Sequence, residues 1–312
     1  MAWKLIRHFD PKSDDHIQGI KYMQGPVAIQ IDNFIRIYYA DRDLSGKSFP
    51  AFFDLDIDNL DTIINTKRTS IIPWGPRGTF DDDGIMPACI ISKNENFLMY
   101  YSGWNRRLTV PYHNTIGLAV SEDNGNSFKR MFDGPILDRS HFDPFMVVTP
   151  WILNSDKWDM WYVSGISWLE IDGKLEPTYG IRHAQSTDGI FWIPEGKNVI
   201  PMRHAEEAIA RPTIISYNNT YHMWYSYRNS RDFRDGNGSY KIGYSYSIDK
   251  INWTRADHLA GFFKSGNEWD EFMQCYPYII NINGSYYLFY NGNSFGKTGI
   301  GLSIWEGPLP LP

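Results

Sequence analysis

Five stretches of this chain share one pattern of hydrophobic and polar positions. In each stretch, polar or acidic residues precede a proline, an apolar segment follows, and a short turn leads into an aromatic-rich segment that ends in Tyr. The prolines are Pro26, Pro87, Pro150, Pro212 and Pro277, and subtracting their numbers gives spacings of 61, 63, 62 and 65 residues. Alternating segments rich in Ile, Val, Tyr and Trp, separated by Asn, Asp, Gly and Ser, are typical of β-strands. A fixed period of this size indicates a repeat architecture.

Each repeat continues with a third strand-like segment. These segments are residues 115–121, 179–186, 241–247 and 298–303, and a turn with an aromatic residue and a fourth segment follow in the middle repeats. Four antiparallel strands that are repeated radially form the blades of a β-propeller. We therefore expect an all-β fold: a five-bladed β-propeller with four antiparallel strands per blade, formed as a single domain by residues 1–312.

The two ends of the chain predict how the ring closes. The last repeat stops after its third strand, whereas residues 3–9, ahead of the first repeat, alternate like a strand. We expect residues 3–9 to supply the outer strand of blade five, which would cover a free sheet edge. A solenoid is the main alternative, but stacked repeats do not require one repeat to be divided between the two termini.

Composition narrows the class of protein. The chain has 312 residues, a net charge of −6 and 42% hydrophobic residues, which is enough for a packed core and argues against disorder. The mild acidity argues against a nucleic-acid partner, and no segment approaches the roughly 18 apolar residues of a membrane span. The N-terminus lacks the apolar stretch of a secretory signal, so we expect a cytoplasmic protein. Cys89 and Cys275 are expected to be buried thiols rather than a disulfide. The oligomeric state stays open.

Several of these segments carry a family resemblance. The Pro-led strands, the strand ends MYYSG and MWYSY and the S-x-D-G-x-x-W turn at residues 186–192 resemble the five-bladed propellers of the arabinanase, levansucrase and invertase superfamily, which includes the β-mannoside phosphorylases. The resemblance covers nearly the whole chain and implies a carbohydrate ligand at one end of a central channel. It also implies an acidic residue beside the proline in several blades, and here this chain departs from the family. The residues before the prolines are Gly25, Met86, Thr149, Arg211 and Tyr276. The resemblance therefore carries over the fold and the place of the site, but no catalytic pair.

Carboxylates nevertheless precede the proline in four of the five repeats. In a blade, the start of the first strand and the loop after the second strand lie on the same face, so these side chains are expected to converge. Sugar transfer commonly uses two carboxyl groups, one as an acid and one as a nucleophile or base. We expect Glu207 and Asp143 to be the catalytic pair, with Asp83 third and His183 as a further acid–base candidate. The alternatives are that such acids solvate the loops and that His183 is structural. The acids before the prolines are Asp81, Asp82, Asp83, Asp143, Glu206, Glu207, Asp270 and Glu271.

Arginines gather on the same predicted face. Arg42, Arg106, Arg107, Arg228 and Arg231 follow second strands, and Arg211 directly precedes a proline. A guanidinium group binds phosphate or carboxylate through two hydrogen bonds, so the cluster predicts a ligand with an anionic group. The alternative, favoured for Arg211, is that these arginines brace the carboxylates. Trp104, Trp168 and Tyr276 are candidates for stacking on a sugar ring. The predicted substrate-binding residues are Arg42, Trp104, Arg106, Arg211, Arg228, Glu271, Tyr276 and Asn291.

These features favour a carbohydrate-active enzyme that resembles glycoside hydrolases or phosphorylases and serves polysaccharide metabolism. Its expected substrate is a small sugar that is anionic, phosphorylated or activated by a nucleotide, bound in the central channel. A non-catalytic sugar-binding or scaffold propeller and a protein-binding platform are the alternatives. The sequence has no His-x-x-His, no cysteine cluster and no calcium loop. It also lacks phosphate-loop and dinucleotide fingerprints, so we expect no metal and no cofactor.

Overall fold

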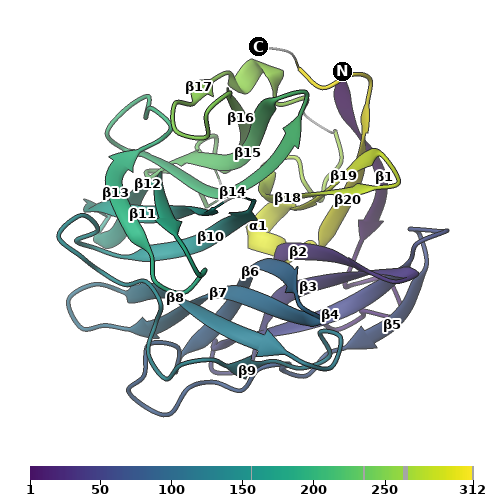
Figure 1. The fold of residues 1–312 in the computed structure, drawn as a ribbon, viewed down its shortest axis with the longest axis horizontal. Helices are drawn as coiled ribbons and strands as arrows, with labels where there is room; N and C mark the ends of the chain where they lie inside the picture. The colour runs from purple at the N-terminus through teal and green to yellow at the C-terminus, as the bar shows by residue number, and fades with distance from the viewer. Residues whose placement is uncertain (156, 235, 263–265, 311–312) are drawn as a thin grey trace.

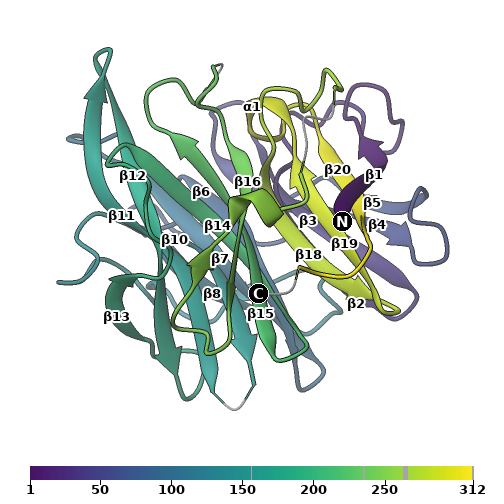
Figure 2. The same ribbon diagram turned by 90° about the horizontal axis from the view of Figure 1, so that it is seen from above.

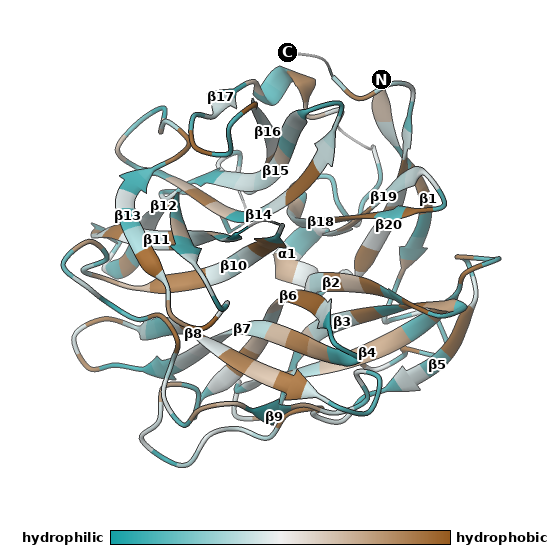
Figure 3. Ribbon diagram, in the orientation of Figure 1, coloured by the Kyte–Doolittle hydropathy of each residue, from teal (hydrophilic) through white to brown (hydrophobic). Residues whose placement is uncertain are grey.

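The fold consists mainly of β-strands. The computed structural model describes residues 1–155, 157–234, 236–262 and 266–310. Within these ranges the helical segments are η1 (Asp257–Leu259) and the four-residue α1 (Asn293–Gly296). None of the described helices is long and apolar enough to cross a membrane. Figure 3 shows hydrophobic residues interspersed with hydrophilic residues along the strands, as the alternating sequence pattern predicts.

The first large sheet comes from the N-terminal part of the chain. Its strands pair antiparallel in chain order from β2 to β5 and again from β6 to β9. One parallel pair of residues, Ser48 opposite Gly84, joins the two runs. The strands are β2 (Gln24–Ile31), β3 (Phe34–Arg42), β4 (Ser48–Asp56), β5 (Ile63–Lys67), β6 (Gly84–Lys93), β7 (Asn96–Arg106), β8 (Tyr112–Ser121) and β9 (Lys129–Arg130).

The second large sheet repeats this arrangement. Antiparallel pairs run from β10 to β13 and from β14 to β17, and Tyr179 opposite Ala208 joins the two runs in parallel. The strands are β10 (Val147–Asn154), β11 (Trp158–Ile171), β12 (Lys174–Ser186), β13 (Ile193–Asn198), β14 (Glu207–Tyr217), β15 (Thr220–Asn229), β16 (Lys241–Ser247) and β17 (Thr254–Arg255).

The third sheet joins the two ends of the chain. It contains β18 (Cys275–Ile282), β19 (Ser285–Asn291), β20 (Ile300–Glu306) and β1 (Ala2–Phe9). β1 pairs antiparallel with β20 along its whole length, from Ala2 opposite Glu306 to Phe9 opposite Ile300. The predicted pairing of the N-terminal strand with the last strand is therefore confirmed.

The strands that contain the repeated prolines form a ring. β2, β6, β10, β14 and β18 contact one another in this order, and β18 contacts β2. Figure 1 shows these strands around the centre of the molecule, with the later strands of each run farther out. Large aromatic side chains of the strands belong to the core, and Trp161, Trp224, Tyr100 and Tyr290 are all buried.

Each strand of the ring has a β-bulge at its proline. Proline has no N–H group to donate to the next strand, so within sheets it is confined to edges and bulges. The residue before the proline has a left-handed backbone in four of the five strands, with φ of 66° at Gly25, 46° at Thr149, 55° at Arg211 and 57° at Tyr276. Non-glycine residues rarely adopt this conformation, and where it persists it often marks a functional site.

Side chains from neighbouring second strands hold these bulges in place. The backbone N–H of Gly25 donates to Asn291 Oδ1 at 2.7 Å, and that of Tyr276 donates to Ser226 Oγ at 2.7 Å. The N–H of Thr149 donates to the Ser102 hydroxyl at 2.9 Å. The unusual backbone at the start of the ring strands is therefore fixed by contacts between successive runs.

One hairpin is longer than the sequence analysis predicted. The third strand of that repeat was expected at residues 179–186, whereas β12 begins at Lys174 and pairs with an extended β11. Asp172 and Gly173, with φ of 50° and 72°, make the tight turn between the two strands. An Asp-Gly turn with positive φ at both residues matches the twist of the strands that it joins, which explains the extension. Figure 2 shows the β11–β12 hairpin projecting beyond the neighbouring strands.

Candidate functional site

The five residues that precede the repeated prolines meet at one cavity. Its volume is about 580 Å³, within the usual range for a small-molecule site, and Gly25, Met86, Thr149, Arg211 and Tyr276 all contribute to its wall. Because these residues lie in the first halves of the five strands of the ring, the cavity lies toward the end of the ring where those strands begin. None of the five is a carboxylate, so the positions at which the family resemblance implies acids carry other side chains here.

Four arginines and one carboxylate supply the charge of the cavity wall. The arginines are Arg42, Arg211, Arg228 and Arg234, and the carboxylate is Glu176. Arg234 Nη2 donates to both oxygens of Glu176, at 2.8 and 3.0 Å. Within the described ranges, no carboxylate lies at ion-pair distance from the other three arginines, which bond to carbonyl, hydroxyl and amide oxygens instead. The wall therefore has an excess of positive charge.

Arg211 crosses the channel. Its Nη1 donates to the carbonyl of Pro87 at 3.0 Å, and its Nη2 donates to the carbonyls of Gly25 and Pro26 at 2.9 and 3.0 Å. The side chain braces two other ring strands through their backbones, and not through carboxylates as the sequence suggested. Burial lowers the pKa of Arg211 to about 10, so the guanidinium stays charged at neutral pH.

Arg228 lies in an aromatic cage. Its guanidinium carbon is 3.8 Å from the centre of the Phe233 ring and 5.1 and 5.5 Å from the rings of Tyr179 and Tyr240. Nε donates to both tyrosine hydroxyls, and Nη2 donates to the Pro177 carbonyl at 2.9 Å. Burial would lower the pKa of Arg228, but the two tyrosines outweigh it and hold the pKa above its usual value.

Of the three arginines without a carboxylate partner in the described structure, Arg42 makes the fewest hydrogen bonds. It is half-buried, donating to the Gly46 carbonyl at 2.9 Å and to Gln24 Oε1 at 3.3 Å. Its guanidinium carbon lies 5.8 Å from the centre of the Trp104 ring, and that of Arg106 lies 5.9 Å from the same ring. Burial lowers the pKa of Arg42, as expected for a cation that lacks a carboxylate partner. Arg42 and Trp104 thus offer a cation and an aromatic surface side by side.

The predicted catalytic carboxylates Glu207 and Asp143 are not among the residues that line the cavity. Glu207 is buried, and both of its oxygens accept hydrogen bonds from Arg255, at 2.7 and 2.9 Å. Asp143 is buried as well and accepts from the Tyr162 hydroxyl and from Arg182 Nη1, each at 3.1 Å. These hydrogen bonds fix the carboxylates of Glu207 and Asp143 in place. The catalytic roles of both residues stay predictions.

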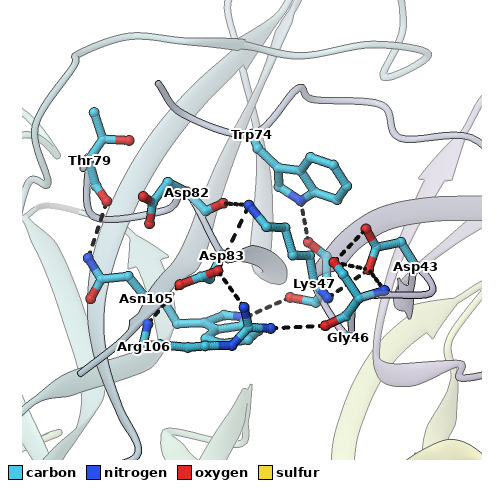
Figure 4. A network of polar contacts seen from close by, with 12 residues as sticks. Asp43, Gly46, Lys47, Trp74, Thr79, Asp82, Asp83, Asn105 and Arg106 are labelled. Atoms are coloured by element: carbon cyan, nitrogen blue, oxygen red, sulfur yellow. Dashed lines mark hydrogen bonds and ion pairs between the residues drawn. The ribbon is translucent and has the colours of Figure 1, made fainter. Parts of the chain in front are cut away.

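The other two predicted catalytic residues also have partners away from the cavity. Asp83 accepts from the backbone N–H of Arg106 at 2.8 Å and from its Nη1 at 3.1 Å, and Figure 4 shows it pointing to Arg106 and Lys47. His183 is buried between Asp159 and Glu195, with its ring nitrogens 2.9 and 2.8 Å from their oxygens. Burial alone would lower the pKa of His183, but these two carboxylates raise it.

The predicted substrate-binding residues divide into two groups. Arg42, Trp104, Arg211, Arg228 and Tyr276 line the cavity together, whereas the other three do not belong to its described wall. Arg106 pairs with Asp83, and Glu271 is exposed. Asn291 accepts from Gly25 and donates to the carbonyls of Met23 and Gly299, so its amide is used within the ring.

Sequence reasoning missed the part of the wall that includes Glu176. This residue and Tyr179 lie at the start of β12, and Phe233 and Arg234 follow β15. The Asp-Gly turn at residues 172–173, between alternating segments, was the available signal, because it predicts a hairpin that brings Glu176 into a strand. No comparable signal marks Phe233, which lies in a loop.

No metal centre is evident in the part of the chain that the structure describes. Groups of three or more His, Cys, Asp or Glu side chains with a geometry that could hold an ion are absent from those ranges. Cys89 and Cys275 are buried free thiols, as the sequence predicted.

Comparison with known proteins gives relatives at two levels. Two proteins of Mycobacterium tuberculosis, uncharacterized protein Rv1502 and uncharacterized protein MT1551, are each 32% identical to this chain over 310 residues, which cover 98% of the chain and 100% of each relative. No protein-family model matches the chain.

Solved structures share the fold at lower identity. A glycoside hydrolase has a TM-score of 0.73 at 17% identity, covering 98% of this chain and 92% of its own. A structure from the family-130 mannoside phosphorylases, whose glycoside hydrolases target β-1,2 mannosidic linkages in Candida mannan, has a TM-score of 0.66 at 16% identity, with 93% and 88% covered. The predicted resemblance to the β-propeller glycosidases is thus confirmed for the fold.

Proposed function

This chain belongs to the same protein family as Rv1502 and MT1551 of Mycobacterium tuberculosis, and we propose that it is a carbohydrate-active enzyme that transfers a sugar between a phosphate oxygen and a hydroxyl group. The observation that carries this proposal is the set of three arginines, Arg42, Arg211 and Arg228, that line one cavity without a carboxylate partner in the described structure.

The arginines support an anionic ligand for an energetic reason. A buried cation without a counter-charge is costly, so an anion that enters the cavity supplies the missing partner. Guanidinium groups match phosphate geometry because they offer several N–H donors in one plane. Arg42 has the fewest bonds to the protein and is half-buried, so it is the first candidate to contact a phosphate directly.

Glu176 is the single carboxylate of the described wall. This favours transfer of a sugar from phosphate over glycoside hydrolysis, which uses two carboxyl groups. Glycoside hydrolysis typically needs a pair of carboxyl groups on either side of the bond that breaks. When phosphate leaves, it needs no proton, because the arginines compensate its charge. One group then suffices to take the proton from the attacking hydroxyl.

The proposed step is balanced and reversible. The bond between the anomeric carbon and the phosphate oxygen breaks, the hydroxyl oxygen bonds to that carbon, and the hydroxyl proton passes to Glu176. In the reverse direction phosphate attacks, and Glu176 returns the proton to the leaving hydroxyl oxygen. Arg234 holds Glu176 through both of its oxygens and so orients it for this exchange.

Aromatic side chains around the cavity fit a sugar ring. Tyr22, Trp104, Tyr112 and Tyr276 contribute to the wall, and aromatic faces pack against the apolar C–H side of a sugar. Burial raises the pKa of Tyr112 and of Tyr276, so both hydroxyls are neutral at physiological pH and can donate hydrogen bonds.

We also propose that residues 1–312 form one domain with five blades. The antiparallel runs β2–β5, β6–β9, β10–β13 and β14–β17 would be four blades, and β18–β20 with β1 would be the fifth. The closed sequence of contacts among β2, β6, β10, β14 and β18 supports this interpretation.

A non-catalytic sugar-binding propeller is the second candidate. It is favoured by the positions of the predicted acids, because Asp83, Asp143 and Glu207 are each held by an arginine outside the described cavity wall. Such a protein would bind an anionic sugar through the same arginines without changing it.

A reaction screen separates the two candidates. Wild-type protein is incubated with sugar 1-phosphates and neutral sugar acceptors, and the released phosphate and the new glycoside are measured. Enzymatic transfer predicts equal amounts of both products, and at least about a hundredfold loss in Glu176→Gln, as expected for a general acid–base group. If sugar phosphates bind but no product forms, the binding-only candidate is correct. If no sugar phosphate binds, enzymatic transfer from a sugar phosphate is wrong.

A further inference from the structure

A second, smaller pocket lies against the cavity. Its volume is about 260 Å³, just below the usual 300–1,000 Å³ of small-molecule sites, so it has room for a small group. Glu176, Phe233 and Arg234 line both spaces. The single carboxylate of the cavity wall therefore stands where the two pockets meet.

The second pocket lies between the tip of one hairpin and one loop. One wall is the tip of the long β11–β12 hairpin, with Ile171, Asp172 and Lys174. The other is the loop after β15, which contributes Arg231 and Asp232. Figure 2 shows this hairpin standing out from the neighbouring strands, so the pocket exists because of the extension at the Asp-Gly turn.

The charges of the second pocket are balanced. Three cationic and three anionic side chains line it, in contrast to the four arginines and one carboxylate of the cavity. They are Lys174, Arg231 and Arg234 with Asp172, Glu176 and Asp232. A balanced set of donors and acceptors has no preference for phosphate but matches the hydroxyl groups of a neutral sugar, each of which both donates and accepts.

Some of the charged side chains in the second pocket already bind other residues of the protein, whereas others make no such contact in the described structure. Arg231 Nε donates to Glu206 at 2.8 Å, and Arg234 is bound to Glu176. In the described structure no hydrogen bond or ion pair engages the side chains of Asp172, Lys174 and Asp232, which are exposed. These three side chains can bind a ligand without first breaking a hydrogen bond or an ion pair in the described structure.

We propose that the second pocket is the subsite for the sugar that carries the reacting hydroxyl group, a neutral monosaccharide unit. This inference rests on the proposed function, because it assigns the phosphate to the cavity and the hydroxyl partner to the neighbouring pocket. Glu176 then lies between the two reactants, where it exchanges the proton with the hydroxyl oxygen. Lys174 and Asp232 are positioning residues, because they bind the acceptor sugar but not the reacting atoms.

The experiment measures neutral sugar and phosphate separately. Saturation-transfer NMR titrations use D-glucose, D-galactose, D-mannose and L-arabinose, with and without inorganic phosphate, on wild type, Lys174→Ala with Asp232→Ala, and Arg107→Ala. Arg107 is exposed and lies outside both pockets, so its variant is the control. We expect at least one sugar to bind wild type and the control, and the double variant to bind it at least about tenfold more weakly, as for the loss of one or more hydrogen bonds to charged groups. The affinity for phosphate should be equal in all three proteins.

Any of three results would overturn the inference. The first is that no sugar binds, and the second is that the sugar binds the double variant as tightly as wild type. Displacement of the sugar by phosphate would also overturn it, because both would then occupy one cavity. Its failure is distinguishable from failure of the proposed function. If phosphate does not bind but the sugar does and depends on Lys174 and Asp232, the proposed function is wrong and the sugar subsite stands. If phosphate binds and the sugar result is negative, the subsite alone is wrong.

Discussion

The guanidinium group of Arg211 donates from Nη2 to the carbonyl oxygen of Gly25 at 2.9 Å, across the central channel. The two residues hold equivalent places in the repeat, each directly before its proline. A side chain at position 25 would put its Cβ 3.0 Å from Arg211 Nη1, so glycine leaves the space that the guanidinium occupies. One repeat supplies the cation and another makes room for it.

This contact predicts the effect of Gly25→Ala. The φ of 66° alone costs roughly 1–2 kcal/mol in any residue with a Cβ, and displacing Arg211 from buried carbonyls adds about 1 kcal/mol or more. Gly19→Ala is the matched control, since Gly19 has a φ of 85° with nothing near its added Cβ. We expect chemical denaturation to show a larger loss of unfolding free energy for Gly25→Ala than for Gly19→Ala. Equal losses would mean that Arg211 is not held at this place.

Arg42→Ala tests the anion site with little effect on the fold. Arg42 is half-buried, and its side chain makes hydrogen bonds only to Gly46 and Gln24 in the described structure, so we expect a loss of less than about 1 kcal/mol in stability. Removing a charge-assisted contact should weaken phosphate binding at least about tenfold. Calorimetric titration with inorganic phosphate measures the change, with Arg107→Ala as control. Unchanged phosphate affinity in Arg42→Ala would remove Arg42 from the site.

Glu207→Gln distinguishes a structural carboxylate from a catalytic one. Glu207 and Arg255 form a buried ion pair at 2.7 Å, with 2% and 7% of their side chains exposed. Breaking a buried pair from one side typically costs about 3–5 kcal/mol, whereas the exposed pair of Lys4 and Glu306 should contribute at most about 1 kcal/mol. We expect Glu207→Gln to unfold at clearly lower denaturant than Lys4→Ala while phosphate affinity stays the same. A stable Glu207→Gln protein that has lost activity would support the catalytic role predicted from sequence.

Two buried histidines should respond to pH in opposite directions. The pKa of His183 is raised: burial opposes the charged form, but Asp159 and Glu195 outweigh it. The stability it contributes is therefore fully present below its unfolded pKa of about 6.5 and is lost as pH rises through the folded pKa. Burial lowers the pKa of His222, so protonation destabilises the fold when pH falls below about 6.5.

The measurement compares unfolding free energies between pH 5 and 9 for wild type, His183→Gln and His222→Gln. The advantage of wild type over His183→Gln should shrink toward high pH, and its advantage over His222→Gln should shrink toward low pH. The same trend for both variants would contradict the assigned environments.

The sequence predicted the elements better than the contacts of individual side chains. The proline period located the ring strands, and Arg42, Trp104, Arg211, Arg228 and Tyr276 do line one cavity. These residues adjoin the bulges or end second strands, where the repeat itself determines their position.

The predicted acids do not line the described cavity wall, because the direction of each carboxylate depends on its local partners. Glu207 begins β14 only five residues ahead of Pro212, yet Arg255 from β17 holds its carboxylate. Sequence spacing does not show which cation captures an acid in the fold. Glu176 was missed for a related reason, since the Asp-Gly turn that places it was not interpreted as a hairpin.

The most direct test of the central claim is a calorimetric titration of wild-type protein with D-glucose 1-phosphate, D-mannose 1-phosphate and inorganic phosphate, each compared with the matching neutral sugar, at low and high salt. We expect the phosphorylated compounds to bind at least about tenfold more tightly than the neutral sugars, and we expect both high salt and Arg42→Ala to weaken their binding. Equal affinity for phosphorylated and neutral sugars, or no binding of any phosphate compound, would contradict it.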